Sequence, residues 1–252
     1  MRSGARTTTA RSASLLFNNL ASCRQYTAYV HYSSAVIVPD SSIASGGGNS
    51  AQCAIVKEPD DAQIQQVRWV PLHAGDLFVV ASTRSLQLYT ADGGRLLHVV
   101  TAGVPEGDPP ASYRGIASCA TAQTEYVCGG CSTGSVCLIP LSPGGGHTFI
   151  DPLLSPASQH EIVDLTAGPA PHLDPDRALV CSADGAGDVH VHALEADGSW
   201  GHCVTFHYDT SDGTPSLCTS LRMRGHRLYC AHSALVRIDD LWARSTSPSP
   251  SP

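Results

Sequence analysis

The sequence predicts an all-β fold, a β-propeller of about five blades, from two observations. Apolar and polar residues alternate with period two along the chain, and no window of a dozen residues keeps a helical stripe. A small or polar turn followed by a short alternating strand also recurs roughly every fifty residues. One four-stranded sheet cannot bury both of its faces, so such repeats gain a core only by packing on their neighbours. The recurring segments are SAVIV from Ser34, SLQLY from Ser85, SVCLI from Ser135, DVHVH from Asp188 and ALVRI from Ala234.

The chain is expected to have three parts. Residues 1–13 form a basic, flexible N-terminal segment, and residues 14–242 form the propeller as a single domain. Residues 243–252 form a disordered Ser/Pro tail, because a low-complexity composition dominated by Ser and Pro cannot build a core.

The second, third and fourth repeats each divide into four strands separated by turn residues. In the second repeat, the short STR turn is what a hairpin between the two middle strands requires. The expected strands are 66–70, 77–81, 85–90 and 96–100 in the second repeat, 115–119, 126–130, 135–140 and 147–150 in the third, and 162–166, 178–182, 188–193 and 203–207 in the fourth.

The fifth repeat ends early. No outer strand follows the strand expected at 235–238, so the last blade is incomplete and the ring can remain open. An open ring exposes strand edges, which are prone to aggregation. Three explanations are considered. The sequence favours a truncated gene product; the alternatives are a five-bladed ring completed by the N-terminal ARTTTAR segment, and a partner that completes the sheet.

The composition excludes several classes of partner. Fifteen Lys and Arg residues against 22 Asp and Glu residues give a net charge of -7, which disfavours nucleic acid. No apolar run approaches the ~20 residues of a membrane span, so membrane insertion is not expected. Ten cysteines, mostly beside apolar or small residues, favour free thiols in a reducing compartment. We therefore expect a cytoplasmic protein; the alternative is an organellar one, because the N-terminus is rich in Arg, Ser and Thr and has no acid before Asp40.

Four residues of the fourth repeat form a pattern of their own. His160 precedes the first strand, Ser182 ends the second, Asp184 lies in the following turn, and His192 lies near the end of the third strand. In these positions the chain resembles the WD-repeat β-propeller family, in which such a set forms a hydrogen-bonded network within a blade. His192 stands where the family usually has tryptophan, and the terminal Trp-Asp pair is missing, so the repeats are degenerate. The resemblance implies a non-catalytic scaffold that binds other proteins and needs no cofactor.

The stretch EYVCGGCSTGSVCLIPL, residues 125–141, contains two motifs typical of catalytic or metal sites. Its G-x-S-x-G, centred on Ser132, is a nucleophile elbow only between a strand and a helix, and here a strand follows. Its C-x-x-C, Cys128 and Cys131, lacks the second pair of a structural zinc site, although Cys137 offers a third sulfur. We therefore interpret the stretch as a hairpin of small core and turn residues.

A third candidate is the pair His190 and His192, which share one face of a predicted strand, with His207 as a neighbour from the next strand. No spacing fixes a third ligand, so packed or solvated histidines are the favoured interpretation. No phosphate-binding or dinucleotide-binding fingerprint occurs. The sequence therefore predicts no enzyme. The alternative is a hydrolase built on a propeller, either metal-dependent through His190 and His192 or serine-dependent through Ser132.

Overall fold

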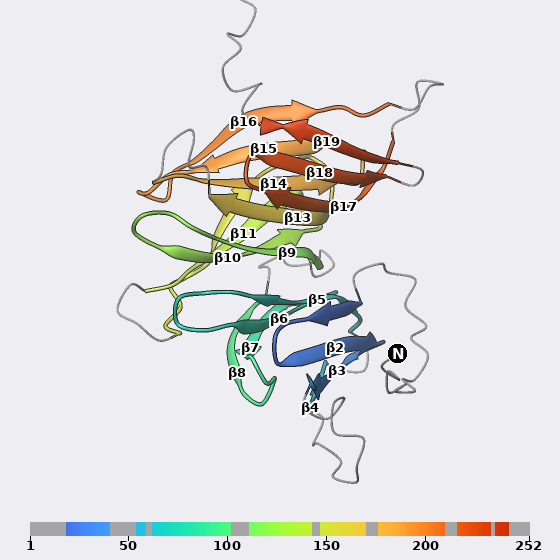
Figure 1. The fold of residues 1–252 in the computed structure, drawn as a ribbon, viewed down its shortest axis with the longest axis vertical. Coiled ribbons are helices and arrows are strands. Elements are labelled where there is room, and N and C mark those ends of the chain that lie inside the picture. Colours follow the sequence, from blue (N-terminus) through green and yellow to red (C-terminus); the bar gives the residue numbers. More distant parts are fainter. Residues whose placement is uncertain are drawn as a thin grey trace, which may run out of the picture. The chain divides into compact units, whose positions relative to one another are not determined.

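The computed structural model describes residues 19–40, 54–58, 62–101, 111–142, 147–169, 176–209, 216–232 and 235–241. The predicted N-terminal segment 1–13 and tail 243–252 lie outside the described residues. Across these ranges the regular elements are nineteen β-strands, arranged in five antiparallel sheets (Figure 1). The all-β prediction is confirmed. None of the described residues belongs to a helix that is long and apolar enough to cross a membrane.

The chain divides into two compact units, of which the first is Met1–Tyr113. It contains two four-stranded sheets, each built from strands that are consecutive in the chain. The two sheets share one core, in which Trp69 packs on Phe78 and donates its indole N–H to the carbonyl of Ala91 at 2.8 Å. The strands are β1 (Leu20–Ser22), β2 (Tyr26–His31), β3 (Ser34–Pro39) and β4 (Ala54–Lys57) in one sheet, and β5 (Ile64–Val70), β6 (Leu77–Ser82), β7 (Leu86–Thr90) and β8 (Leu96–Val100) in the other.

The second unit is Arg114–Pro252, and it contains two four-stranded sheets followed by one with three strands. We call them the first, middle and last sheets of this unit. The first sheet is β9 (Tyr113–Ala120), β10 (Glu125–Cys131), β11 (Ser135–Pro140) and β12 (Leu153–Pro156). The middle sheet is β13 (Ile162–Pro169), β14 (Ala178–Asp184), β15 (Val189–Leu194) and β16 (Trp200–Phe206), and the last sheet is β17 (Cys218–Arg224), β18 (Arg227–His232) and β19 (Val236–Asp240).

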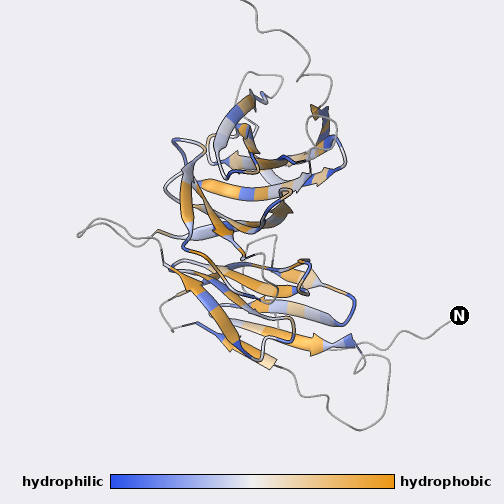
Figure 2. Cartoon of the chain, turned by 90° about the vertical axis from the view of Figure 1, so that its left-hand side faces the viewer, coloured by the Kyte–Doolittle hydropathy of each residue, from blue (hydrophilic) through white to orange (hydrophobic). Residues whose placement is uncertain are grey.

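Two cores hold the three sheets of the second unit together. The first and middle sheets share a core that includes Leu138 and Val180, and the middle and last sheets share one that includes Val191 and Leu228. The middle sheet is therefore covered on both faces and the last sheet on one. Figure 2 shows the most hydrophobic segments along the strands rather than in the connections between them.

The expected strands of the second and fourth repeats agree with β5–β8 and β13–β16 to within a few residues. The outer strand expected at 147–150 is wrong. Those residues contain only an isolated bridge between Phe149 and Leu141, and the fourth strand is β12, which pairs with Ser135–Leu138 of β11. The bridge turns the chain back at the end of β11, so the next apolar segment, and not residues 147–150, aligns with that strand. The fifth sheet ends at β19 without an outer strand in the described residues, as expected.

Gly134 packs the turn between β10 and β11 against the loop that follows β12. Its φ is 82°, and a Cβ at this position would lie 2.2 Å from the carbonyl oxygen of Ser158. The Gly134 carbonyl accepts hydrogen bonds from the backbone N–H groups of Ala157 and Ser158. Only glycine fits both the backbone conformation and the contact. This contact fixes Ser158 next to the turn that follows β14.

Candidate functional site

The last sheet has an outer face that contributes nothing to the core. Leu221 and Leu228 are core residues, so they mark the inner face of this sheet. Three rows of paired residues, each with one residue from β17, β18 and β19, lie on the opposite face. The aliphatic part of this face is open to solvent, since Val236 is 62% and Ile238 is 58% exposed. The rows of this outer face are Ser220, Ala231 and Val236; Arg222, Tyr229 and Ile238; and Arg224, Arg227 and Asp240.

The last sheet is basic although the whole chain is acidic. Its strands contain four arginines and two aspartates, whereas the chain has a net charge of -7. On the outer face, Arg222, Arg224 and Arg227 are exposed and form no ion pair with any described residue. The outer face is therefore a positively charged surface with an aliphatic border along β19.

The free edge of β19 carries backbone groups that point away from the sheet. Within the described ranges, β19 pairs only with β18. The carbonyl of Leu235 accepts from His232 and the N–H of Leu241 donates to His226, so the odd-numbered residues bond to β18. The alternate residues Val236 and Ile238 consequently direct their N–H and C=O groups outward. These are the groups that an added strand would bond.

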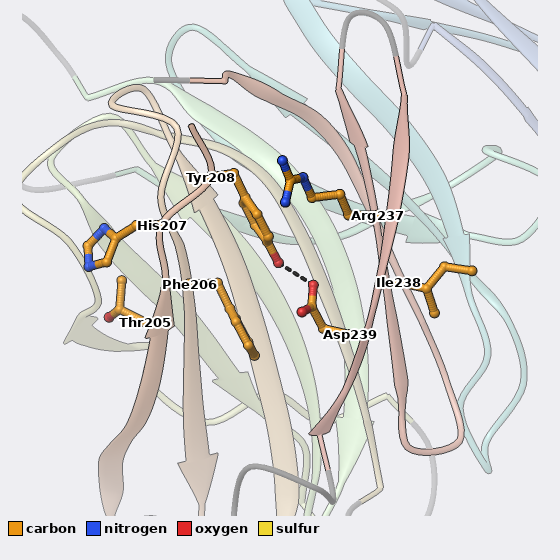
Figure 3. A pocket seen from close by; sticks show the side chains of 7 residues that line it. All are labelled: Thr205, Phe206, His207, Tyr208, Arg237, Ile238 and Asp239. Atoms are coloured by element: carbon orange, nitrogen blue, oxygen red, sulfur yellow. Dashed lines mark hydrogen bonds between the residues drawn. The ribbon is translucent and has the colours of Figure 1, made fainter. Parts of the chain in front are cut away.

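A pocket of about 470 Å³ lies between the end of β16 and the inner side of β19 (Figure 3). The Tyr208 hydroxyl donates to Asp239, and the Arg237 guanidinium lies over the Tyr208 ring, 5.2 Å from its centroid. Burial and the bond to Asp239 raise the pKa of Tyr208 above its ordinary value, so the phenol stays a donor. Figure 3 shows Arg237 and Asp239 pointing towards Tyr208 while Ile238 points to the other side. The side chains of β19 thus alternate between this pocket and the outer face.

A second cluster surrounds Asp184, at the end of β14. The Asp184 side chain is buried, and its Oδ2 accepts from Ser158 Oγ at 2.5 Å and lies 2.9 Å from His190 Nε2. Its Oδ1 accepts from the backbone N–H groups of Ala186 and Asp188, each at 3.0 Å. Burial acts to raise the pKa of Asp184, but the hydrogen bonds from Ser158 and His190 outweigh it and hold the pKa below its ordinary value. The carboxylate is fully hydrogen-bonded and charged.

Thr205 of β16 continues this cluster. Its Oγ1 lies 3.0 Å from His190 Nδ1 and 2.9 Å from His202 Nε2. One arrangement of protons satisfies every partner: His202 donates to Thr205, Thr205 donates to His190, and His190 donates to Asp184. A hydrogen-bonded chain of side chains from three strands therefore ends on the buried carboxylate.

Asp188 extends the cluster towards solvent. Its Oδ1 lies 2.7 Å from Nδ1 of His207, an exposed residue just past β16. One possible ligand atom from each of Asp184, Asp188 and His190 lies within 4.8 Å of the other two. Among the described residues, no other group of three His, Cys, Asp or Glu side chains is as closely spaced. The same residues border a pocket of about 520 Å³ that is also lined by His192.

The four residues expected to form the WD-like network are not bonded to one another in the structure. Ser182 Oγ is buried without a hydrogen-bond partner in the described part of the chain. His160 is exposed, and its backbone N–H donates to Ser158 Oγ at 3.0 Å. Asp184 is bonded to Ser158 and to His190, which takes the place expected for His192 because it lies nearer the turn that holds Asp184.

His192 is a packed side chain. It is 4% exposed, stacks on Trp200 with 4.6 Å between ring centroids, and meets His202 edge-on. Burial, and then the neighbouring His202 and His190, lower the pKa of His192 to about 4, so the ring is neutral. The Trp200 indole in turn donates to the carbonyl of Pro156 at 3.0 Å. His192 is therefore a buried, packed histidine, one of the two outcomes in the favoured interpretation of this pair.

The three cysteines of residues 125–141 are buried and form no shared site. Cys128 and Cys131 are three residues apart on β10, which places them on opposite faces of the strand. Burial raises the pKa of Cys137 to about 12, and a contact with Cys119 together with burial raises the pKa of Cys128. Cys128 and Cys137 are therefore protonated, and all three cysteines are buried in the hairpin, consistent with the hairpin interpretation.

Ser132 lies in the turn between β10 and β11, with a strand on each side. The strand-to-helix geometry of a nucleophile elbow is therefore not formed there. Within the G-x-S-x-G motif, Gly134 has a structural role, because it allows the turn to pack against Ser158.

The sequence patterns did not identify four residues of the Asp184 cluster: Ser158, Asp188, His202 and Thr205. The spacing of Asp184, Gly185, Gly187 and Asp188 in a predicted turn was an available signal, since Asp side chains often bond turn backbone. Ser158 and Thr205 gave no signal, because they meet Asp184 and His190 only through the pairing and stacking of strands.

A comparison with protein-family models finds no match for this chain, and no curated protein matches it. The resemblance to the WD-repeat family therefore remains a prediction.

Proposed function

We propose that this chain is a propeller-type scaffold of the WD-repeat kind, without catalytic activity, that binds a protein partner through its last sheet. In this proposal each sheet is a blade, and an extended segment of the partner adds to β19 as the fourth strand. The observation that carries it is the last sheet itself: among the described residues it has three strands, whereas each of the other four sheets has four.

Strand addition fits the chemistry of the β19 edge. An extended peptide that pairs with an open strand gains main-chain hydrogen bonds, and its alternate side chains enter different environments. On β19 these environments are the aliphatic side chains of Val236 and Ile238 on the outer face and the pocket of Tyr208 and Arg237 on the inner side. The outward backbone groups of Val236 and Ile238 supply the bonds.

The charge of the last sheet favours an acidic partner. Arg222, Arg224 and Arg227 lie on the outer face without a described ion pair, and Arg237 lies beside the open edge. Complementary charge accelerates association and selects the partner, more than it sets affinity. We therefore propose an extended segment in which acidic residues alternate with aliphatic ones. The chain's own tail is a poorer occupant, because residues 245–252 contain no acidic side chain to meet the arginines of the last sheet.

The test uses a defined probe, a fluorescent ten-residue peptide of alternating Glu and Val, titrated against the purified full chain by fluorescence anisotropy. We expect saturable binding that weakens as salt rises, and at least about tenfold weaker binding of the matched Lys and Val peptide. Equal binding of the two peptides would contradict an acidic partner.

Ile238→Pro is the decisive variant, because proline removes the outward N–H of Ile238 and leaves the bonds between β18 and β19 in place. We expect it to abolish peptide binding. Ile238→Thr is the matched control, since it keeps the N–H and loses only apolar surface, and its binding is expected to fall by a smaller factor. Unchanged binding by Ile238→Pro would exclude strand addition. Tighter binding after deletion of residues 1–13 would identify the N-terminal segment as the occupant instead of a partner.

Partner binding is expected to take place in the cytoplasm, with an organelle as the alternative. The nine cysteines in the described residues are free thiols, which suits a reducing compartment. A turnover of ester, peptide or phosphate substrates by the purified chain would contradict the non-catalytic proposal and favour the hydrolase alternative.

A further inference from the structure

We propose that Asp184, Asp188 and His190, with His207 as fourth ligand, bind a divalent zinc ion at the outer end of the middle sheet. Three of the four ligands lie away from the surface proposed for the partner, and only His207 also lines the Tyr208 pocket. Variants at Asp188 and His190 therefore test the metal site separately from partner binding. Two imidazoles and two carboxylates are a ligand set that zinc accepts in tetrahedral sites.

Two pairs of these ligand atoms already lie near the spacing of a tetrahedral zinc site. A zinc ion with bonds of about 2.0–2.1 Å holds its ligand atoms about 3.3 Å apart. His190 Nε2 lies 2.9 Å from Asp184 Oδ2, and His207 Nδ1 lies 2.7 Å from Asp188 Oδ1. One ligand atom from each of Asp184, Asp188 and His190 lies within 4.8 Å of the other two. Side-chain rotations that widen the two short contacts would bring these groups around one ion, and the contact with Asp188 keeps His207 next to them.

The partners of these side chains hold them in the orientation that a metal needs. His190 Nδ1 lies 3.0 Å from Thr205 Oγ1. When Nδ1 carries the ring proton and donates it to Thr205, Nε2 is unprotonated and can bind the ion. Asp184 is held by Ser158 Oγ and by two backbone N–H groups, and it keeps those bonds when the ion replaces the proton of His190. Outer partners of this kind fix ring orientation and strengthen metal binding.

The site is accessible and its charge balances. Asp188 is 29% and His207 is 69% exposed at the side chain, so the ion enters from solvent on the side of these two residues. The buried carboxylate of Asp184 and that of Asp188 together neutralise a divalent ion. His207 is the most exposed of the four and is therefore expected to close the site last.

The experiment is a titration of the metal-free full chain with Zn²⁺ by calorimetry and with Co²⁺ by visible absorption. We expect one equivalent of either metal to bind, with the d–d absorption of a four-coordinate site and no sulfur-to-cobalt charge-transfer band. That spectrum separates the proposed site from binding by the ten cysteines. A charge-transfer band, or no saturable uptake at micromolar metal, would overturn the proposal.

Variants assign the ligands. His190→Gln and Asp188→Asn are expected to weaken zinc binding about 100-fold or more, and His207→Ala about tenfold. His207→Ala tests the site without a risk to folding, because the side chain is exposed. The matched control is His226→Ala, which removes another exposed histidine, 3.6 Å from Asp240, and is expected to bind zinc like the natural chain. Unchanged zinc binding in both His207→Ala and Asp188→Asn would overturn the assignment.

Discussion

The middle and last sheets of the second unit are built from the same repeat but are buried to different extents. The central strand β14 of the middle sheet is buried at every position, whereas β18 of the last sheet alternates between buried and more exposed residues. The difference is already present in their sequences, since ALVCSAD has small or apolar residues on both faces and RLYCAH places Arg227 and Tyr229 on one of them.

This comparison shows that the outer face is not simply a core surface left uncovered. A face meant for an apolar neighbour would repeat the pattern of β14, but the outer face of β17 and β18 carries Arg222, Arg224 and Arg227. Its large aliphatic residues, Val236 and Ile238, lie on β19, next to the open edge. The sequence of the last sheet therefore suits a polar, acidic partner at that edge better than another sheet stacked on its face.

We expect the largest change in the free energy of unfolding at a tightly packed turn, in comparison with an open one. Gly134→Val should destabilise the chain by about 4 kcal/mol or more, because its Cβ meets backbone atoms of Ser158 and its φ is positive. Gly225→Asn, in the turn between β17 and β18, is the control, since nothing lies within 4 Å of its Cβ position. We expect it to cost less than about 1 kcal/mol, because Asn tolerates positive φ. Urea denaturation measures both, and similar costs would contradict the comparison.

The next largest changes in stability compare β18, which is buried on one face, with β14, which is buried on both faces. Leu228→Ala, on the inner face of β18, should cost about 3 kcal/mol, whereas Tyr229→Ala on the outer face should cost less than about 1 kcal/mol. On β14, Leu179→Ala and Val180→Ala should both cost about 2 kcal/mol or more, since the two residues belong to different cores. An equal cost for Leu228→Ala and Tyr229→Ala in chemical denaturation would mean that the outer face is covered in solution.

A smaller effect compares the Asp–His contacts of the two sheets. Asp184→Asn should cost about 2 kcal/mol, because the buried carboxylate accepts bonds from Ser158, His190 and two backbone groups. Asp240→Asn should cost less than about 0.5 kcal/mol, because its contact with His226 is exposed. Thermal unfolding at neutral pH distinguishes these two losses of stability. An Asp184→Asn variant as stable as the natural chain would show that the cluster does not stabilise the middle sheet.

The smallest effect concerns single amides of β19. Amide hydrogens of Val236 and Ile238 should exchange with solvent faster than those of Arg237 and Asp239, because only the latter pair bonds to β18. Hydrogen exchange followed by NMR measures this alternation, and addition of the Glu and Val peptide should slow exchange at Val236 and Ile238. Equal protection of all four amides in the free chain would indicate that the β19 edge is already paired.

Much of the fold was predictable because its signal is local. Alternation and turn residues located β5–β8 and most of β13–β16, and they predicted that no outer strand follows β19 in the described residues. The strand expected at 147–150 failed, since Phe149 and Ile150 are apolar but the chain folds back there through the bridge to Leu141. Local pattern does not distinguish two neighbouring apolar segments, and only the pairing with β11 selects Leu153–Pro156.

The sequence by itself determined the all-β class, about five repeats and the strands of the second and fourth repeats, because each depends on period-two alternation within one strand and on the turns between strands. Only the tertiary structure decided which side chains meet. Asp184 bonds to Ser158, 26 residues earlier in the chain, and to His190 rather than His192, because strand register and the turn held by Gly134 bring those atoms together. Such contacts form across strands and between sheets, so no spacing in the sequence encodes them.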